Sequence, residues 1–393
     1  MGDAGRIVIF FVGLAVVLGT AVNVFMSLVV PRSHYSRLRR AITRLSLALV
    51  RPVLPRLKNY ESRDRVMSVV GPLALILLFI SWLVLVVVGF GLMLWWVTGE
   101  TLAHSFAISG SSVFTLGVAT GPHPGTTFVE FVAAGTGLLI IAMEIAYLPA
   151  MYAAFAAREA EVTLLAPRAG WPAWGPEILA RHHWFRTEAE LPELYGSWER
   201  WAAGVAESHS NYPPLMWFRS PVYNRSWLLS LAAMLDAAAL QDALNPGTAP
   251  RQARIFLMMG VDCLRSLART LRIPYDPDPK PSDPIRLTYE EFADGLRRLD
   301  EVEYEAERTP EEAWRHFAGW RVGYEPIVDA LTELIVAPPA PWLVDRPEIG
   351  PSVHPGVRNR TPDDPEGQPA GWRKKRPAPP SGPATPAADE PSA

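Results

Sequence analysis

Three long apolar runs in the first 160 residues constrain the fold of this chain more than any other feature. They cover residues 7–30, 66–97 and 127–157, and the stretch 73–88 in the middle run contains no charged residue. A helix rises about 1.5 Å per residue, so about 20 apolar residues cross a hydrocarbon core of about 30 Å. All three runs exceed that length. The sequence therefore predicts an all-α membrane protein with three transmembrane helices.

A cleaved signal peptide is the alternative interpretation of the first run. The run is longer than the apolar region of a signal peptide, which has about 7 to 15 residues. The sequence Pro31-Arg32-Ser33 that follows it also lacks the small residues of a cleavage site. Both observations favour an uncleaved transmembrane helix.

The charges of the connecting segments predict the orientation. Ten Lys or Arg residues lie between positions 31 and 65, and none lies between 98 and 126. The positive-inside rule places the first segment in the cytoplasm and the second outside. The expected location is the cell membrane, with the N-terminus outside and the chain after Arg158 in the cytoplasm. The single cysteine, Cys263, would then lie in a reducing compartment.

Residues 99–125, between the second and third runs, are unlike an ordinary loop. Residues 101–114 can form a short amphipathic helix, whereas 115–125 are rich in Gly and Pro and cannot continue it. Irregular backbone at membrane depth is tolerated only when protein covers it or when it lines a water-filled path. A short helix followed by an extended strand with glycine is the construction of a selectivity filter. We expect a re-entrant loop; the alternative is an extracellular loop, which is usually more polar.

Residues 66–160 resemble the pore module of potassium channels, in which two transmembrane helices flank a pore helix and a filter. That family's filter reads Thr-Val-Gly-Tyr-Gly-Asp, and Thr115 and Gly117 match its first and third positions. The other four positions carry different residues, namely Leu116, Val118, Ala119 and Thr120.

The resemblance implies a homotetrameric cation channel, because one loop per chain closes a pore only when four chains surround an axis. The carbonyls of residues 115–118 would coordinate a permeant monovalent cation such as potassium, and neither a cofactor nor a metal centre is implied. A Cβ at Ala119 disfavours the backbone angles that the family's second glycine permits. A less selective pore and a pore-like fold that does not conduct therefore both remain open.

Four residues of the third run are candidates for a cavity or a gate, namely Gly135, Gly137, Glu144 and Pro149. Glycines and proline are places where a helix can bend, and the resemblance implies that such a bend opens the inner gate. Close packing of small residues between helices is an equal alternative. A carboxylate inside a membrane is costly and usually faces a cavity or a partner, so Glu144 is predicted to lie in the cavity unless the span ends near Pro149.

The chain beyond the third run is predicted to form a cytoplasmic all-α domain. Helical spacing of apolar residues begins near residue 188 and continues through 225–244 and 249–271. Capping patterns at Thr288 and Thr309 open two further helices, the last ending near residue 336. The predicted divisions are 1–65 (first helix and basic segment), 66–160 (pore module), 161–346 (helical domain) and 347–393 (a Pro-rich tail expected to be disordered).

Enzymatic chemistry finds little support in the sequence. Ser208 and His209 could act as a nucleophile beside a base, but no glycine elbow accompanies them. His182 and His183 have no further ligand at metal-binding spacing. We expect no enzyme and no nucleic-acid partner, and the partner of the helical domain stays open. The expected function is a cation channel subunit; a non-conducting, membrane-anchored scaffold or sensor is the alternative, and a hydrolase that uses His209 ranks last.

Overall fold

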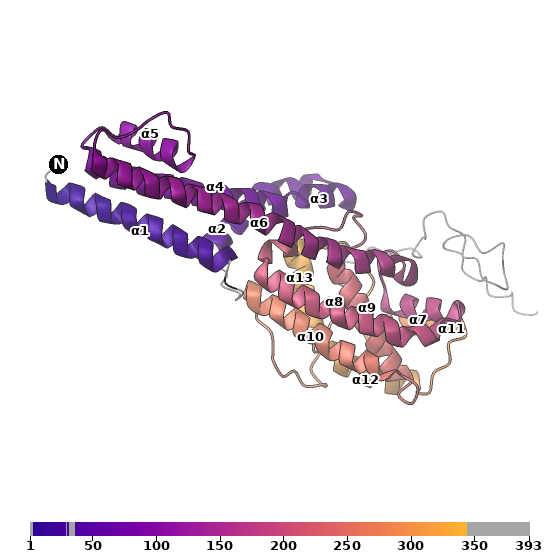
Figure 1. Cartoon of the computed structure of the whole chain (residues 1–393). Helices are drawn as coiled ribbons and strands as arrows, with labels where there is room; N and C mark the ends of the chain where they lie inside the picture. Colours follow the sequence, from indigo (N-terminus) through magenta and orange to yellow (C-terminus); the bar gives the residue numbers. More distant parts are fainter. Residues whose placement is uncertain (1–2, 29, 31–35, 344–393) are drawn as a thin grey trace, which may run out of the picture. The chain divides into compact units, whose positions relative to one another are not determined.

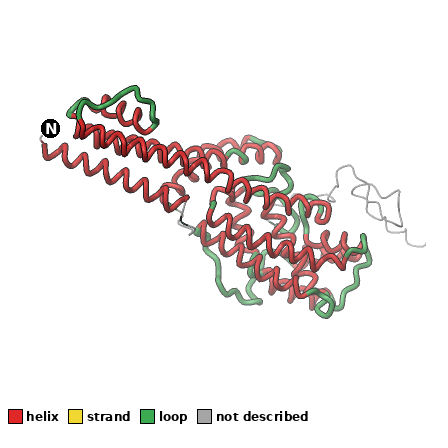
Figure 2. Tube along the Cα trace, in the orientation of Figure 1, coloured by secondary structure: helices red, strands yellow, loops and turns green. Residues whose placement is uncertain are grey.

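The protein is helical throughout the part that the structure describes. A computed structural model describes residues 3–28, 30 and 36–343 of the 393-residue chain (Figures 1 and 2). Every regular element in these residues is an α-helix or a short 3-10 helix, and they contain no strand. The prediction of an all-α protein is confirmed. The tail 347–393, predicted to be disordered, lies outside the described residues.

Among the described residues, four helices are long and apolar enough to cross a membrane, namely α1 (Asp3–Leu28), α4 (Val70–Thr98), α6 (Pro124–Ala169) and α9 (Trp227–Leu244). In the most apolar stretches of α1 and α6 only 22% of the residues are buried, whereas the stretch in α9 is 100% buried. Large apolar surfaces are unfavourable in water. The exposed apolar faces of α1 and α6 are therefore typical of helices in a membrane, and α9 is typical of a protein core.

Helix α1 packs along α4 through small residues. A Cβ built at Gly13 would lie 2.5 Å from the backbone oxygen of Gly89, so the two helices approach closely at this point. Small residues at such crossings allow dense packing between helices in a membrane. Farther along the pair, the indole Nε1 of Trp82 donates a hydrogen bond of 3.0 Å to Asn23 Oδ1.

Three short helices precede α4, namely α2 (Arg37–Val50), η1 (Arg51–Arg56) and α3 (Tyr60–Met67). Helix α2 packs on the first turns of α4. Ile42 belongs to the same core cluster as Leu78 of α4, and Val50 shares a cluster with Val70. The segment that the sequence marked only as a basic loop is thus largely helical.

Helix α6 has 46 residues, which corresponds to a length of about 69 Å. A hydrocarbon core is about 30 Å thick, so much of this helix must project beyond a membrane. The helix continues beyond the apolar run 127–157 to Ala169, so the predicted division at residue 160 falls within α6. Pro149 does not interrupt the helix.

The remaining helices pack around α9. They are α7 (Gly175–Trp184), α8 (Leu191–Asn211), α10 (Arg251–Leu271), α11 (Tyr289–Asp300), α12 (Pro310–Arg321) and α13 (Glu325–Ile335). Helices α7, α10 and α12 contact α9 directly. The helices predicted from 188, 225, 249 and 288 are confirmed, but the single helix predicted from Thr309 to residue 336 is two helices. Pro326 lacks the N–H that a continuous helix would require, so the chain breaks before α13.

A buried ion pair network joins α9 to α12 and α13. Arg321 donates hydrogen bonds of 2.7 Å to Asp236 and 2.8 Å to Glu325, and the Tyr324 hydroxyl donates one of 2.7 Å to Asp236. Burial by itself would lower the pKa of Arg321, but the two carboxylates outweigh burial and raise it. The guanidinium therefore stays charged and fixes the three helices to one another.

Candidate functional site

Helix α5 (Leu102–Val113) returns along α4 after the chain reverses at Gly99 (Figure 1). The Thr98 hydroxyl lies 3.3 Å from that of Ser105, and Ser109 Oγ donates a hydrogen bond of 2.8 Å to the carbonyl of Val87. Val87 lies eleven residues before Thr98, which corresponds to about 16 Å along α4. The short helix predicted at 101–114 is confirmed, and its end lies deep beside α4.

The end of α5 also presses against α6. A Cβ built at Gly137 would lie only 2.1 Å from the carbonyl oxygen of Val113, whereas one built at Gly135 would meet nothing within 4 Å. Gly137 lies thirteen residues after Pro124, or about 20 Å along α6. This contact agrees with close packing at Gly137, one of the two alternatives from the sequence, and the role of a gate stays a prediction. Gly135 lies on the exposed side of α6.

The loop that follows α5 is tied to the helix by its N–H groups. The amides of Thr115 and Leu116 donate to the carbonyls of Ser112 and Ser111, at 2.9 and 2.8 Å. The next two bonds go to a side chain, because the amides of Val118 and Ala119 donate to the Ser111 hydroxyl at 3.0 and 3.1 Å. Ser111 is itself buried, so it holds the loop from within.

The far end of the loop is held by a carboxylate. The amide of Gly121 donates a hydrogen bond of 2.6 Å to Glu130 Oε1, one helical turn into α6 beyond Thr126. No local pattern in the sequence assigned Ser111 or Glu130 to the loop. A serine just before the end of a short helix is only a weak signal, and the partners of both residues became visible only in three dimensions.

The carbonyl groups of the loop differ from its N–H groups in their hydrogen bonding. Within the described part of the chain, the carbonyl oxygens of residues 115–118 accept no hydrogen bond. The side chains of Leu116 and Val118 are 62% and 80% exposed. In the predicted filter segment 115–119, four of the five N–H groups are therefore hydrogen-bonded, whereas the carbonyls of 115–118 accept no hydrogen bond among the described residues and the Leu116 and Val118 side chains are exposed.

The backbone of residues 115–119 differs from what the family's filter pattern predicts. Thr115 and Gly117 have positive φ angles, of 54° and 68°, whereas Ala119 does not. The expected conflict at Ala119 does not arise, because the left-handed positions lie at Thr115 and at Gly117. Glycine adopts this conformation without the cost that a Cβ imposes, so Gly117 is the residue that the turn requires.

Glu144 and Pro149 lie farther along α6. Glu144 is half-buried, and its Oε1 atom is buried without a hydrogen bond partner. It follows Ile140 by four residues and precedes Tyr147 by three, so it shares their buried face of the helix. Glu144 lies twenty residues after Pro124, or about 30 Å along α6, which equals the thickness of a hydrocarbon core. Pro149 is exposed.

A buried guanidinium joins α6 to the helical domain. Arg158 donates to Glu159 at 2.9 Å and to the carbonyls of Leu215 and Phe218 at 2.9 and 2.7 Å, and it lies 2.9 Å from His209 Nε2. Burial, followed by the Arg158 charge, holds the pKa of His209 well below its ordinary value. The residue that seemed to close an apolar run is thus an anchor of α6 on α8 and on the turn that follows it.

That turn, η3 (Pro213–Trp217), also contacts the beginning of α4. A Cβ built at Gly71 would lie 2.6 Å from the ring of Phe218. The carbonyl of Phe218 is bound by Arg158, so one short segment of the helical domain touches both α4 and α6. A displacement of this segment would act on the two long helices that flank α5.

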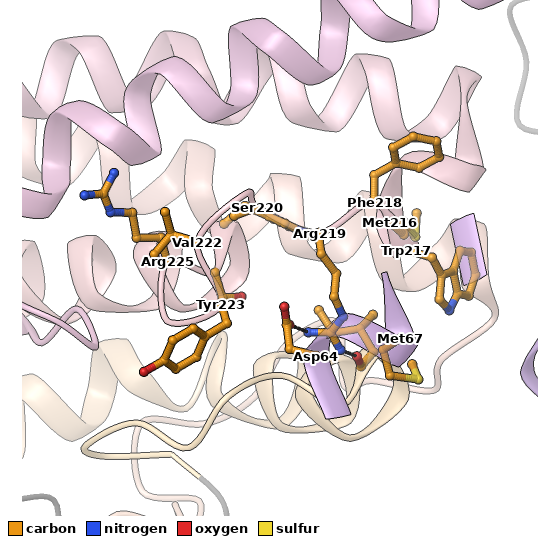
Figure 3. A pocket seen from close by; sticks show the side chains of 13 residues that line it. Asp64, Met67, Met216, Trp217, Phe218, Arg219, Ser220, Val222, Tyr223 and Arg225 are labelled. Carbon is orange, nitrogen blue, oxygen red and sulfur yellow. Dashed lines mark hydrogen bonds and ion pairs between the residues drawn. The ribbon is translucent and has the colours of Figure 1, made fainter. Parts of the chain in front are cut away.

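A second joint lies where α3 meets the segment before α9 (Figure 3). Arg219 forms an ion pair of 2.7 Å with Asp64 and donates a hydrogen bond of 2.7 Å to the carbonyl of Val336. The adjoining cavity, which Ser220 and Trp217 also line, has a volume of about 20 Å³. That volume holds about one water molecule, so this place is a structural joint and not a ligand pocket.

The residues considered for catalysis have structural partners. Ser208 Oγ lies 3.1 Å from His209 Nδ1, but His209 is fully buried and the Ser208 hydroxyl also donates a hydrogen bond of 2.7 Å to the carbonyl of Gly204. His182 Nδ1 lies 2.8 Å from the carbonyl of Ile178. Among the described residues, no group of three His, Cys, Asp or Glu side chains is placed to hold a metal ion.

Comparison of the chain with protein-family models, with curated proteins and with solved structures gives no match. The resemblance to the potassium channel pore module therefore rests on the order of helix, short helix, loop and helix, and on Thr115 and Gly117.

Proposed function

We propose that the protein is a subunit of a cation channel, in which four chains surround one ion path. The observation that carries this proposal is the contrast between the N–H groups and the carbonyl groups of the loop after α5. Its N–H groups at residues 115, 116, 118 and 119 are bound by α5, and the carbonyls of 115–118 accept no hydrogen bond within the described residues. Free carbonyls that point at a common axis can replace the hydration shell of a cation.

The membrane arrangement in this proposal has three spans and one re-entrant segment. Helices α1, α4 and α6 span the membrane, and α9 belongs to the core of the helical domain because its faces are covered. The end of α5 reaches about 16 Å along α4, roughly half of a hydrocarbon core. The basic segment before residue 65 favours an N-terminus outside and a cytoplasmic helical domain, and the membrane is proposed to be the plasma membrane.

Neighbouring copies are proposed for two reasons, and their number, four, comes from the resemblance. Backbone at membrane depth must be covered by protein or line a water-filled path, and residues 115–118 are exposed in the single chain. The apolar side chains of Leu116, Val118 and Phe131 are exposed as well, and neighbouring chains would cover them. The permeant ion is proposed to be monovalent, with potassium as the first candidate from the resemblance.

The test is cation flux into liposomes that contain the purified protein, with two matched glycine variants. Gly117 and Gly99 both have a φ of 68°, and a Cβ at either would meet nothing within 4 Å. Gly117→Asp and Gly99→Asp therefore place an aspartate at the same φ and add the same charge. We expect flux in the wild type and in Gly99→Asp, and loss of flux in Gly117→Asp.

The oligomeric state is measured on the same samples by native mass spectrometry. A tetramer with flux that Gly117→Asp abolishes supports the channel, and the series of transported ions then gives the selectivity. A protein that never forms tetramers overturns the shared pore. Equal flux in Gly117→Asp and the wild type would remove residues 115–118 from the ion path.

A second function, a membrane-anchored scaffold or sensor without conduction, is favoured by two observations. The positions of Val118 and Ala119 depart from the family's filter, while the Arg158 anchor ties α6 firmly to a large helical domain. Correctly inserted tetramers that show no flux over a range of voltage and pH would favour this function over the channel.

A further inference from the structure

Helices α2 and η1 form a basic surface beside α4. Between residues 36 and 60 the chain contains seven Lys or Arg residues and no Asp or Glu. The arginines at positions 37, 44, 51 and 56 are exposed, and none of them forms an ion pair within the described residues. Arg39 differs, because it is buried and donates a hydrogen bond of 3.2 Å to the carbonyl of Ser27. The exposed arginines thus present uncompensated positive charge.

Large apolar side chains are exposed on the same surface. Leu45, Leu49 and Val53 are 50%, 58% and 40% exposed, and Leu45 directly follows Arg44. The opposite face of α2, with Ile42 among its residues, is buried against α4. A helix that exposes arginines together with leucines is typical of the boundary between headgroups and acyl chains, where both kinds of side chain are satisfied.

The contact with α4 places this surface at the edge of a membrane. Ile42 of α2 shares a core cluster with Leu78, which lies twenty residues before Thr98, or about 30 Å along α4. Val50 shares a cluster with Met67 and Val70, still farther from that end. If Thr98 lies at one side of the hydrocarbon core, α2 lies at the other side.

We propose that the exposed face of α2 and η1 binds the headgroups of anionic lipids. The arginines would contact the headgroup phosphates, Leu45 would reach the acyl region, and Leu49 and Val53 would lie among the headgroups. The inference rests on the membrane arrangement in the proposed function, but it requires neither conduction nor a tetramer.

The test measures which lipids the full-length protein retains. Purified protein in detergent is incubated with equal amounts of phosphatidylglycerol and phosphatidylcholine, and bound lipids are counted by native mass spectrometry. The wild type should prefer phosphatidylglycerol. A basic residue at a membrane surface contributes about a fivefold preference, so Arg37→Gln, Arg44→Gln and Arg51→Gln together should lower the preference by about 100-fold.

A matched variant keeps the change in net charge but moves it to the helical domain. Arg200→Gln, Arg251→Gln and Arg315→Gln also replace exposed arginines, and this variant should retain the preference of the wild type. Leu45→Ser with Leu49→Ser should weaken retention of both lipids and leave their ratio unchanged. All variants should keep the melting temperature of the wild type, because the substituted side chains are exposed.

Three outcomes would overturn the inference: equal retention of the two lipids by the wild type, an unchanged preference in the α2 variant, or equal losses in both triple variants. Inorganic phosphate should displace the lipid no better than sodium chloride of the same ionic strength, and stronger displacement would assign the surface to soluble phosphate. Flux is measured separately. A protein that conducts without a lipid preference refutes only this inference, and one that prefers phosphatidylglycerol without conducting refutes only the channel.

Discussion

The contact between Gly137 and the end of α5 allows a sharp test with two glycines that lie two residues apart. A Cβ at position 137 would lie 2.1 Å from the Val113 oxygen, whereas ordinary contacts begin at 3.4 Å, so α5 would have to move by about 1.3 Å. The obstacle is backbone and not a flexible side chain. Overpacking of this kind costs about 1 to 3 kcal/mol. The preference of alanine for a helix offsets about 1 kcal/mol of this, so Gly137→Ala should lower the free energy of unfolding by about 1 kcal/mol.

Gly135→Ala is the control, because its Cβ would meet nothing within 4 Å. Alanine is favoured over glycine inside a helix by about 1 kcal/mol, so this variant should be as stable as the wild type or more stable. Thermal unfolding in detergent measures both variants, and flux in liposomes reports the position of the loop. A Gly137→Ala protein as stable as Gly135→Ala would show that α5 does not press against α6 as described.

Three further predictions concern single side chains. Ser111→Ala removes the acceptor for the amides of Val118 and Ala119 and should cost about 2 kcal/mol in thermal unfolding, whereas Ser112→Ala should cost much less. The pKa of His209 is lowered in the folded protein, so the imidazole of the unfolded chain binds a proton at a higher pH than that of the folded chain. The free energy of unfolding should therefore fall by up to about 1.4 kcal/mol per pH unit below pH 6.5, and His209→Gln should reduce this slope. Burial alone would raise the pKa of Glu177, but Arg298 and Arg181 outweigh burial and lower this pKa. The free energy of unfolding of Glu177→Gln should therefore be about 3 kcal/mol lower than that of the wild type at pH 7, and the difference should narrow below pH 4.5.

The pH predictions separate two parts of the helical domain. His209 belongs to the Arg158 anchor, whereas Glu177 of α7 accepts a hydrogen bond of 2.7 Å from Arg181 and one of 2.6 Å from Arg298 of α11. The free energy of unfolding, measured by circular dichroism between pH 4 and pH 8, should therefore change its slope with pH at two places. An acid dependence that His209→Gln leaves unchanged would contradict the role of the buried imidazole.

The short helix before the loop illustrates how far the sequence alone reaches. The bounds 101–114 were predictable because Thr101 is an N-cap and because glycine and proline end the helix soon after residue 114. The positions that hold the loop were not, since Ser111 bonds to amides seven and eight residues away and Glu130 to one nine residues back. Such bonds depend on how the chain turns between α5 and α6, which no local pattern encodes.

The basic segment before α4 is a second example of a feature that the sequence predicted only in part. Its charge predicted the orientation in the membrane, but its helices, and the face that leaves Arg44 and Leu45 exposed together, depend on packing against α4. The two helices at the end of the domain were predicted as one, because the capping pattern at Thr309 gives only the start of a helix and the local signal of Pro326 was not used.

The sequence by itself determined the apolar helices and the short helix between two of them, because helix length, capping and the thickness of a membrane are local or external constraints. The tertiary structure alone decided which groups meet. The Ser111 hydroxyl accepts hydrogen bonds from the loop amides, Gly137 packs on the end of α5, and Arg158 binds residues more than fifty positions away. These contacts join segments that are distant along the chain, and the closure of such contacts is set by the packing of whole helices and not by the residues beside them.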